Sequence, residues 1–272
     1  PQGSLWAARA ALAGGLDATS NVLAALRLGE KPSGTMAHAL VMAIGATEGS
    51  EDKAFSAFHR YFPGAPLLVD TYDTISAVER LAVKVKSGEI TLSGVRLDSG
   101  DLVEQSQKVR SLLPDVPILA SGDIDEWEIS RLQENGAEID GYGIGTRLVT
   151  GQPVNGVYKL VEIDDKPVMK ESKSKLTYPG RKQIFRLFFE DKMQADILGL
   201  ADENVPTNES SIRIEPLLEL IMKDGQRITS PEIIAQIRQR TSNSVASLPP
   251  ETRLLQNPTS IPVENATQLI DL

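Results

Sequence analysis

Charged and small polar residues follow a short apolar strand pattern in the segment GVRLDSGD, which runs from Gly94 to Asp101. Arg96 and Asp98 stand at the carboxyl end of that strand, where α/β proteins bind their ligands and where core packing gives no reason for charge. Ser99 and Asp101 have a second explanation, because their oxygens can cap the helix that begins next. The segment therefore predicts either a ligand site or a capped turn.

The same arrangement recurs at other strand ends, which favours a ligand site over an isolated cap. It is found in VDTYD (residues 69–73), ASGDID (residues 120–125) and GYGIGTR (residues 141–147). Mg²⁺, bound through water, and the hydroxyls of a ribose are ligands that suit such carboxylates. Four aspartates are candidates for this role: Asp70, Asp73, Asp98 and Asp101.

The glycines of these turns are typical of a phosphate site. GYGIGTR lacks the third glycine of the dinucleotide-binding fingerprint, but its backbone N–H groups at a helix start would suit a phosphate monoester. Gly122 in the neighbouring turn would allow a ligand to approach the backbone closely.

Histidine occurs only at His38 and His59. His38 stands in SGTMAHALVMA, near the start of a predicted helix, where the helix dipole favours the neutral and nucleophilic imidazole. A buried, hydrogen-bonded histidine on an apolar helix face is the alternative for His38. For His59, in AFHRYF, we expect a packing or surface role.

The elements that must position these residues alternate as strands and helices. Helices are predicted over residues 4–13, 21–28, 35–44, 52–61, 75–85, 102–113 and 126–135. Short apolar strands are predicted over residues 67–70, 94–98, 117–121 and 140–145. Their spacing of ~24 residues is typical of a parallel sheet, and the polar strand ends favour a (β/α) barrel. An open doubly wound sheet is the alternative fold.

The pattern changes after residue 152. GVYKLVEI (residues 156–163) alternates like an antiparallel strand, and hairpins are predicted near residues 189–193 and 223–228. The expected organisation is a barrel portion over residues 1–152, a β-rich segment over 153–241 and an extended, lightly packed tail over 242–272.

Composition narrows the class of protein. A net charge of −9 and a pI near 4.9 argue against a nucleic-acid partner. No apolar run approaches the ~20 residues that span a membrane, and the absence of cysteine excludes disulfides and thiolate nucleophiles. We expect a cytoplasmic protein. Because the sequence opens without Met and inside a helix pattern, we expect a fragment or processed chain that lacks an N-terminal part.

Seven motifs in collinear order resemble the nicotinate phosphoribosyltransferase family. They span roughly residues 1–185 and include DATSN, GTMAH, VDTYD, GVRLDSGD, ASGDID and GYGIGTR. The resemblance implies the irregular (β/α) barrel of the type II phosphoribosyltransferases, here an α/β fold with a mostly antiparallel C-terminal extension. It also implies that nicotinate and phosphoribosyl pyrophosphate react to nicotinate mononucleotide and pyrophosphate in NAD salvage, driven by ATP hydrolysis with Mg²⁺.

The resemblance assigns roles to individual residues. His38 matches the histidine that ATP phosphorylates, and Asp98 with Arg96 matches residues at the ribose and base. The remaining matches are substrate-binding positions: Thr19, Ser20 and Asn21 near the base, and Gly122, Gly143, Gly145 and Thr146 around the 5′-phosphate. No residue is assigned as a direct metal ligand.

Two alternatives to this function stay open. One is the nicotinamide or quinolinate phosphoribosyltransferase of the same fold, which would differ in the base pocket. The other is a truncated, non-catalytic remnant that binds partners. The resemblance also implies a homodimer, and position 39 is Ala where many members carry Ser.

Overall fold

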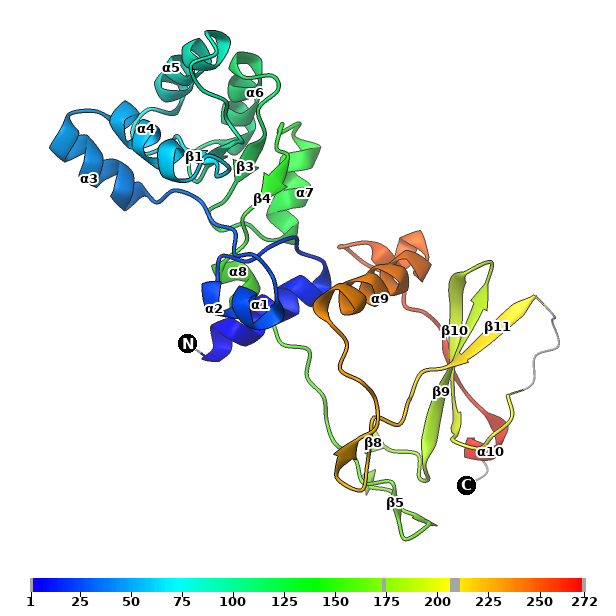
Figure 1. Ribbon diagram of the computed structural model, residues 1–272. Helices are drawn as coiled ribbons and strands as arrows, with labels where there is room; N and C mark the ends of the chain where they lie inside the picture. Colours follow the sequence, from blue (N-terminus) through cyan, green and yellow to red (C-terminus); the bar gives the residue numbers. More distant parts are fainter. Residues whose placement is uncertain (1, 173–174, 206–210, 271–272) are drawn as a thin grey trace. The chain divides into compact units, whose positions relative to one another are not determined.

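The computed structural model describes residues 2–172, 175–205 and 211–270, and the chain forms two compact units (Figure 1). The first unit comprises residues 1–12 and 16–152, and the second comprises residues 13–15 and 153–272. The main boundary therefore lies between Gln152 and Pro153.

A four-stranded parallel sheet organises the first unit. Its strands, in spatial order, are β1 (Leu67–Leu68), β2 (Val95–Leu97), β3 (Ile118–Ala120) and β4 (Gly141–Tyr142). The helices between them are α5 (Thr74–Lys86), α6 (Leu102–Leu112) and α7 (Glu126–Glu134). Because sequence neighbours pair in parallel, the four carboxyl ends and the turns after them lie along one edge of the sheet.

This unit also contains α1 (Gln2–Gly14) up to Leu12, together with α2 (Val22–Leu28), α3 (His38–Glu48), α4 (Glu51–Tyr61) and α8 (Thr146–Val149). Helix α3 begins three residues later than predicted. The hydroxyl of Thr35 donates to the carbonyl of Pro66 at 3.1 Å, and the side chain of Met36 is buried in the core. These two anchors hold the chain extended through Ala37, so His38 becomes the first helical residue.

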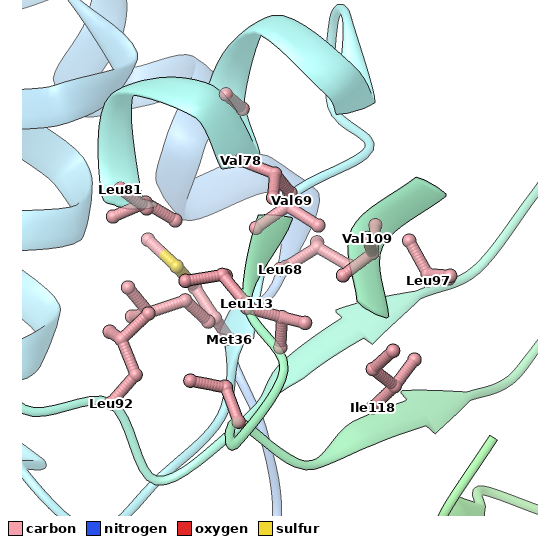
Figure 2. Close-up of a cluster of buried hydrophobic side chains, with 14 of the residues drawn as sticks. Met36, Leu68, Val69, Val78, Leu81, Leu92, Leu97, Val109, Leu113 and Ile118 are labelled. Carbon is pink, nitrogen blue, oxygen red and sulfur yellow. The ribbon is translucent and has the colours of Figure 1, made fainter. Parts of the chain in front are cut away.

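Aliphatic side chains from the strands and the surrounding helices form one core (Figure 2). Leu68, Leu97 and Ile118 come from three neighbouring strands, while Leu81 and Val109 come from the helices α5 and α6. All five are at most 1% exposed, so each contributes close to its full hydrophobic transfer free energy, roughly 1.5–3 kcal/mol for a Leu or Ile. This core fixes the strands whose ends carry the polar residues.

The second unit is built on a mostly antiparallel sheet, in the order β11–β9–β10–β14. These strands are β9 (Lys182–Phe189), β10 (Lys192–Leu200), β11 (Ile212–Pro216) and β14 (Val263–Asn265), of which β14 runs parallel to β10. Three short hairpins are β5 (Glu162–Ile163) with β6 (Lys166–Pro167), β7 (Glu171–Ser172) with β8 (Lys175–Leu176), and β12 (Met222–Lys223) with β13 (Gln226–Arg227). The helices are α9 (Ile234–Ser247), a 3₁₀ turn (Pro250–Arg253) and α10 (Thr267–Ile270).

One sequence expectation for this region is wrong, and a second is contradicted only in part, since most side chains of the tail are exposed as expected. The strand predicted over residues 156–163 exists only as β5, because residues 156–161 are not paired in any sheet of the described residues. The tail from residue 242 is not simply extended. Helix α9 continues to Ser247, β14 pairs with β10, and Glu203 accepts a hydrogen bond from the backbone N–H of Gln268 in α10. These long-range contacts supply order that the Ser, Pro and Asn composition does not indicate.

Candidate active site at the strand ends

The carboxylate of Asp70 ties the start of helix α3 to the turn after β2. Asp70 is the second residue after β1, and its side chain is only 2% exposed. Its Oδ1 lies 3.2 Å from His38 Nε2, while its Oδ2 accepts hydrogen bonds from the Asp98 N–H at 2.8 Å and the Ser99 hydroxyl at 2.9 Å. A buried carboxylate is stable only with such partners, and Asp70 has three.

Asp98 connects the second strand end to the third. The hydroxyl of Ser121, directly after β3, donates a short hydrogen bond to Asp98 Oδ1, and the backbone N–H of Ser121 donates to Leu97 O at 2.9 Å. Gly122 follows with a φ of +89°, and a Cβ there would stand 2.2 Å from the carbonyl oxygen of Asp98. Only glycine allows this approach, so packing against Asp98 already requires Gly122. Its expected role around the 5′-phosphate stays a prediction.

Arg96 supplies positive charge beside these carboxylates. Its guanidinium lies 3.6 Å from Asp98 Oδ1, and the side chain is 18% exposed. The Nε of Arg96 is buried without a hydrogen-bond partner among the described residues. A buried donor without a partner is costly, so this guanidinium has capacity to bind an anionic ligand.

Three other aspartates of the strand ends are helix caps. Asp73, Asp101 and Asp125 each accept hydrogen bonds from first-turn N–H groups of α5, α6 and α7, respectively. The capping explanation is therefore correct for Asp101. Within residues 2–172, 175–205 and 211–270, no cluster of three or more His, Cys, Asp or Glu side chains could hold a metal ion. Any Mg²⁺ here would need ligands from the substrate as well as from a carboxylate such as Asp98.

The predicted phosphate loop follows β4. Gly143 donates its N–H to Ala120 O at 2.7 Å, and a Cβ there would stand 3.2 Å from the Cβ of Ser121, so a small residue lets this loop approach the third strand end. Gly145 and Thr146 are exposed and begin α8, a single turn. The loop thus borders the Asp98–Ser121 pair, while its role in phosphate binding stays a prediction.

Thr19, Ser20 and Asn21 lie between α1 and α2. The side chain of Asn21 caps α2 by accepting a hydrogen bond from Ala24 N at 3.0 Å. The backbone N–H of Asn21 donates to the hydroxyl of Thr19. The backbone of Thr19 accepts from Ser33 N at 2.9 Å, five residues before His38. Among the described residues, these side chains and backbone groups bond to one another, to α1 through Ser4 and to Ser33, and not to Asp98. Their proposed role near the base stays a prediction.

Sequence reasoning did not identify how Asp70, Ser99 and Ser121 are used. The structure shows the carboxylate of Asp70 bound to His38 and to the Asp98 turn, while its expected role toward Mg²⁺ or ribose stays a prediction. A usable signal was present, since Asp70 and Asp98 both occupy the first polar position after an apolar strand.

Comparisons with known proteins place this site in a family. Over 261 residues the chain is 39% identical to nicotinate phosphoribosyltransferase pncB2 of Mycobacterium tuberculosis, covering 92% of this chain and 54% of that protein. It is 34% identical to the nicotinate phosphoribosyltransferase of Bacillus subtilis, with 96% and 60% covered, and 33% identical to that of Homo sapiens, with 95% and 63% covered. The chain therefore spans between about half and two-thirds of these relatives.

The C-terminal part and the fold give the same result. Residues 210–272 match the family model of the nicotinate phosphoribosyltransferase C-terminal domain. The structure of human nicotinic acid phosphoribosyltransferase matches with a TM-score of 0.76 and 29% identity, over 100% of this chain and 67% of that one. That of nicotinate-nucleotide pyrophosphorylase from Pyrococcus furiosus matches with a TM-score of 0.72 and 29% identity, over 88% and 61%.

The predicted fold class is confirmed: an α/β fold of the type II phosphoribosyltransferases, with a mostly antiparallel C-terminal extension. Among the described residues, no helix is both long and apolar enough to cross a membrane. By sequence and by fold, this chain belongs to the nicotinate phosphoribosyltransferase family.

Proposed function

We propose that the protein carrying this chain transfers the phosphoribosyl group of phosphoribosyl pyrophosphate to nicotinate, forming nicotinate mononucleotide and pyrophosphate for NAD salvage. The observation that carries the proposal is the linked set His38–Asp70–Asp98, which joins one helix start to two strand ends. Relatives named for this reaction, at 33–39% identity, support the choice of substrates.

In this proposal Asp98 and Arg96 act on the reacting groups. Loss of pyrophosphate leaves positive charge on the ribose, and the carboxylate of Asp98 would stabilise that charge. Its orientation is held by Ser121, so little reorganisation is needed during the reaction. The partly exposed guanidinium of Arg96 is suited to the carboxylate of nicotinate, a planar anion that an arginine can bind with two parallel hydrogen bonds.

ATP coupling through His38 is the second part of the proposal. The His38 side chain is 38% exposed, so a phosphoryl donor can reach it. Ala37 precedes the helix and has no side-chain oxygen to cap it, unlike the aspartates that precede α5, α6 and α7. The uncapped N–H groups of α3 would stabilise the negative charge of a phosphoryl group on His38.

Mg²⁺ would neutralise the leaving pyrophosphate when bound. Asp98, with a side chain that is 31% exposed, is the carboxylate of this set that a substrate-borne Mg²⁺ could reach. The proposal also includes ATP and Mg²⁺ as cofactors, a homodimer as the assembly and the cytoplasm as the location.

Product formation by the purified, full-length protein tests the proposal. With phosphoribosyl pyrophosphate, Mg²⁺ and ATP, we expect nicotinate mononucleotide from nicotinate and far less product from nicotinamide or quinolinate, measured by chromatography. A preference for quinolinate or nicotinamide would move the protein to the other members of the fold, and no product from any base would favour the non-catalytic alternative.

A second measurement tests ATP coupling alone. Incubation with γ-labelled ATP and Mg²⁺ should place an acid-labile, base-stable label on the protein, and His38→Ala should lose it. His59→Ala is the matched control and should keep the label. Equal labelling of wild type and His38→Ala would remove His38 from the reaction.

A further inference from the structure

The two oxygens of the Asp70 carboxylate serve two different parts of the site. Oδ1 faces His38 Nε2, and Oδ2 accepts from the Asp98 N–H and the Ser99 hydroxyl. The side chain is 2% exposed, so solvent does not substitute for these partners. An ionised carboxylate only accepts hydrogen bonds, so the ring nitrogen that faces it must carry the proton.

We infer that Asp70 is a positioning residue that holds His38 in the tautomer with Nε2 protonated and links that choice to the turn bearing Asp98. The neutral ring then has its lone pair on Nδ1. The anchors Thr35 and Met36 fix the backbone just before His38, so the position from which the ring reaches Asp70 is defined.

The consequence for phosphorylation rests on the proposed function. The Nδ1 lone pair attacks the γ-phosphorus of ATP, the bond to the β–γ bridging oxygen breaks, and ADP leaves with that electron pair. The Nε2 proton stays shared with Asp70 throughout. The carboxylate thereby stabilises the positive charge that the ring acquires when both nitrogens are substituted, as the aspartate of a catalytic triad does for its histidine.

The second duty of Asp70 links this event to the ribose side. The Asp98 N–H and the Ser99 hydroxyl share the same carboxylate, so a movement of His38 changes the bonding of the turn that presents Asp98. Asp98 continues the link to Ser121 after the third strand. One buried side chain therefore connects the phosphoryl acceptor with the carboxylate that faces the ribose.

Nuclear magnetic resonance of ¹⁵N-histidine in the whole chain tests the tautomer. The chain has two histidines, and His59→Gln identifies the signals of His38. At a pH of about 8, well above the ordinary histidine range, we expect His38 Nε2 to show a protonated and Nδ1 an unprotonated nitrogen shift. This measurement leaves Asp70 intact, so it does not depend on whether an Asp70 variant folds. A protonated Nδ1 on His38 would overturn the inference.

Two variants then test whether Asp70 sets this state. Asp70→Asn presents an amide that can donate to Nε2, so the tautomer should shift toward protonated Nδ1. Asp73→Asn, three residues later and a helix cap at the surface, is the matched control and should leave His38 unchanged. An unchanged tautomer in a folded Asp70→Asn would remove Asp70 from this role.

The link to the turn has its own measurement. In Asp70→Ala, the amide hydrogen of Asp98 should exchange with solvent about tenfold faster or more than in Asp73→Ala, because its acceptor is lost. An equal exchange rate of the Asp98 amide in the two variants would show that Asp70 does not hold the Asp98 turn. In the full-length protein, label on Nε2 of His38 would also overturn the inference. The expected tautomer without any labelling would instead count against ATP coupling alone and leave the role of Asp70 intact.

Discussion

Two aspartates three residues apart have different duties in one turn. Asp98 accepts from Ser121 and faces Arg96, whereas the carboxylate of Asp101 accepts from the N–H groups of Val103 and Glu104. Removing each of them should therefore affect different properties of the protein.

Asp98→Asn in the full-length protein should keep the melting temperature within a few degrees, because an amide oxygen still accepts from Ser121. The kcat should fall by ~100-fold or more, since the charge stabilisation at the ribose that we propose for Asp98 would be lost. Asp101→Ala is the control and should lose about 1 kcal/mol of folding stability with kcat retained. A large fall in melting temperature with kcat preserved would make Asp98 structural. The site would then move to Asp70 or to Asp123, the first aspartate of the ASGDID segment after β3.

Substitutions at two glycines of the site should affect different properties, because Gly122 is needed for packing and Gly145 is proposed to bind phosphate. Gly122→Ala would place a Cβ 2.2 Å from Asp98 O on a backbone with a φ of +89°. We expect this variant to lower the free energy of unfolding by roughly 1–3 kcal/mol. At Gly145 φ is −128° and nothing lies within 4 Å of an added Cβ. The ψ of −103° lies outside the α and β regions that Val prefers, so Gly145→Val should lose some stability in urea even though its side chain meets no neighbour. In the folded variant, phosphoribosyl pyrophosphate binding by calorimetry should still be weakened. Unchanged affinity would place the phosphate elsewhere.

Individual site residues were easier to predict than their connections. His38, Arg96 and Asp98 stand in motifs that sequence spacing reveals. The structure joins His38 to the Asp98 turn through Asp70 and places Arg96 beside Asp98. The bond from His38 to Asp70 spans 32 residues and depends on the anchors Thr35 and Met36, which no local pattern indicates.

At the scale of elements, Asp140 joins α6 to two strands. Its Oδ2 accepts from Ile118 N at 2.7 Å, at the start of β3, and from Arg110 of α6 at 2.5 Å, while β4 begins at the next residue. Burial acts to raise the pKa of Asp140, but the bonds from Ile118 N and the charge of Arg110 outweigh it, and the pKa lies below its ordinary value.

The lowered pKa of Asp140 makes its stabilisation depend on pH. Because the folded pKa is below the unfolded value of about 3.9, the contribution is present above that value and is lost as the pH falls through the folded pKa. Asp140→Asn should thus unfold at lower urea than wild type near neutral pH, and the difference should shrink below about pH 4. A difference that is constant across pH would show that the charge of Asp140 does not stabilise the fold.

Element prediction succeeded where the strand–helix rhythm is regular. The strands of the parallel sheet occur where sequence patterns placed them. The hairpin between β9 and β10 does so too, and Glu190 and Asp191 in its turn have positive φ. It failed for residues 156–161 and for the tail, because pairing partners far away in the sequence decide both outcomes.

At the scale of the whole molecule, the two units are joined by an exposed segment. Residues 152–160 are exposed and carry no helix or strand, and Tyr158 in it is 86% exposed. Brief digestion with chymotrypsin should cut first after Tyr158, yielding two fragments by mass spectrometry. Tyr178 is half-buried, its hydroxyl accepts from Asn265, and it should be cut later. Early cuts inside the parallel sheet would contradict the division into two units.

The caps of α5, α6 and α7 have a consequence for how substrates arrive. Asp73, Asp101 and Asp125 share the strand-end rim with Asp98. Under the proposed function, an anionic substrate would therefore approach this negative charge before it reaches the guanidinium of Arg96. Diffusional encounter with a bare polyphosphate is then opposed rather than steered. Because ~0.1 M salt screens charges beyond about 10 Å, the association rate of pyrophosphate with this chain should rise with ionic strength, as stopped-flow measurements would show.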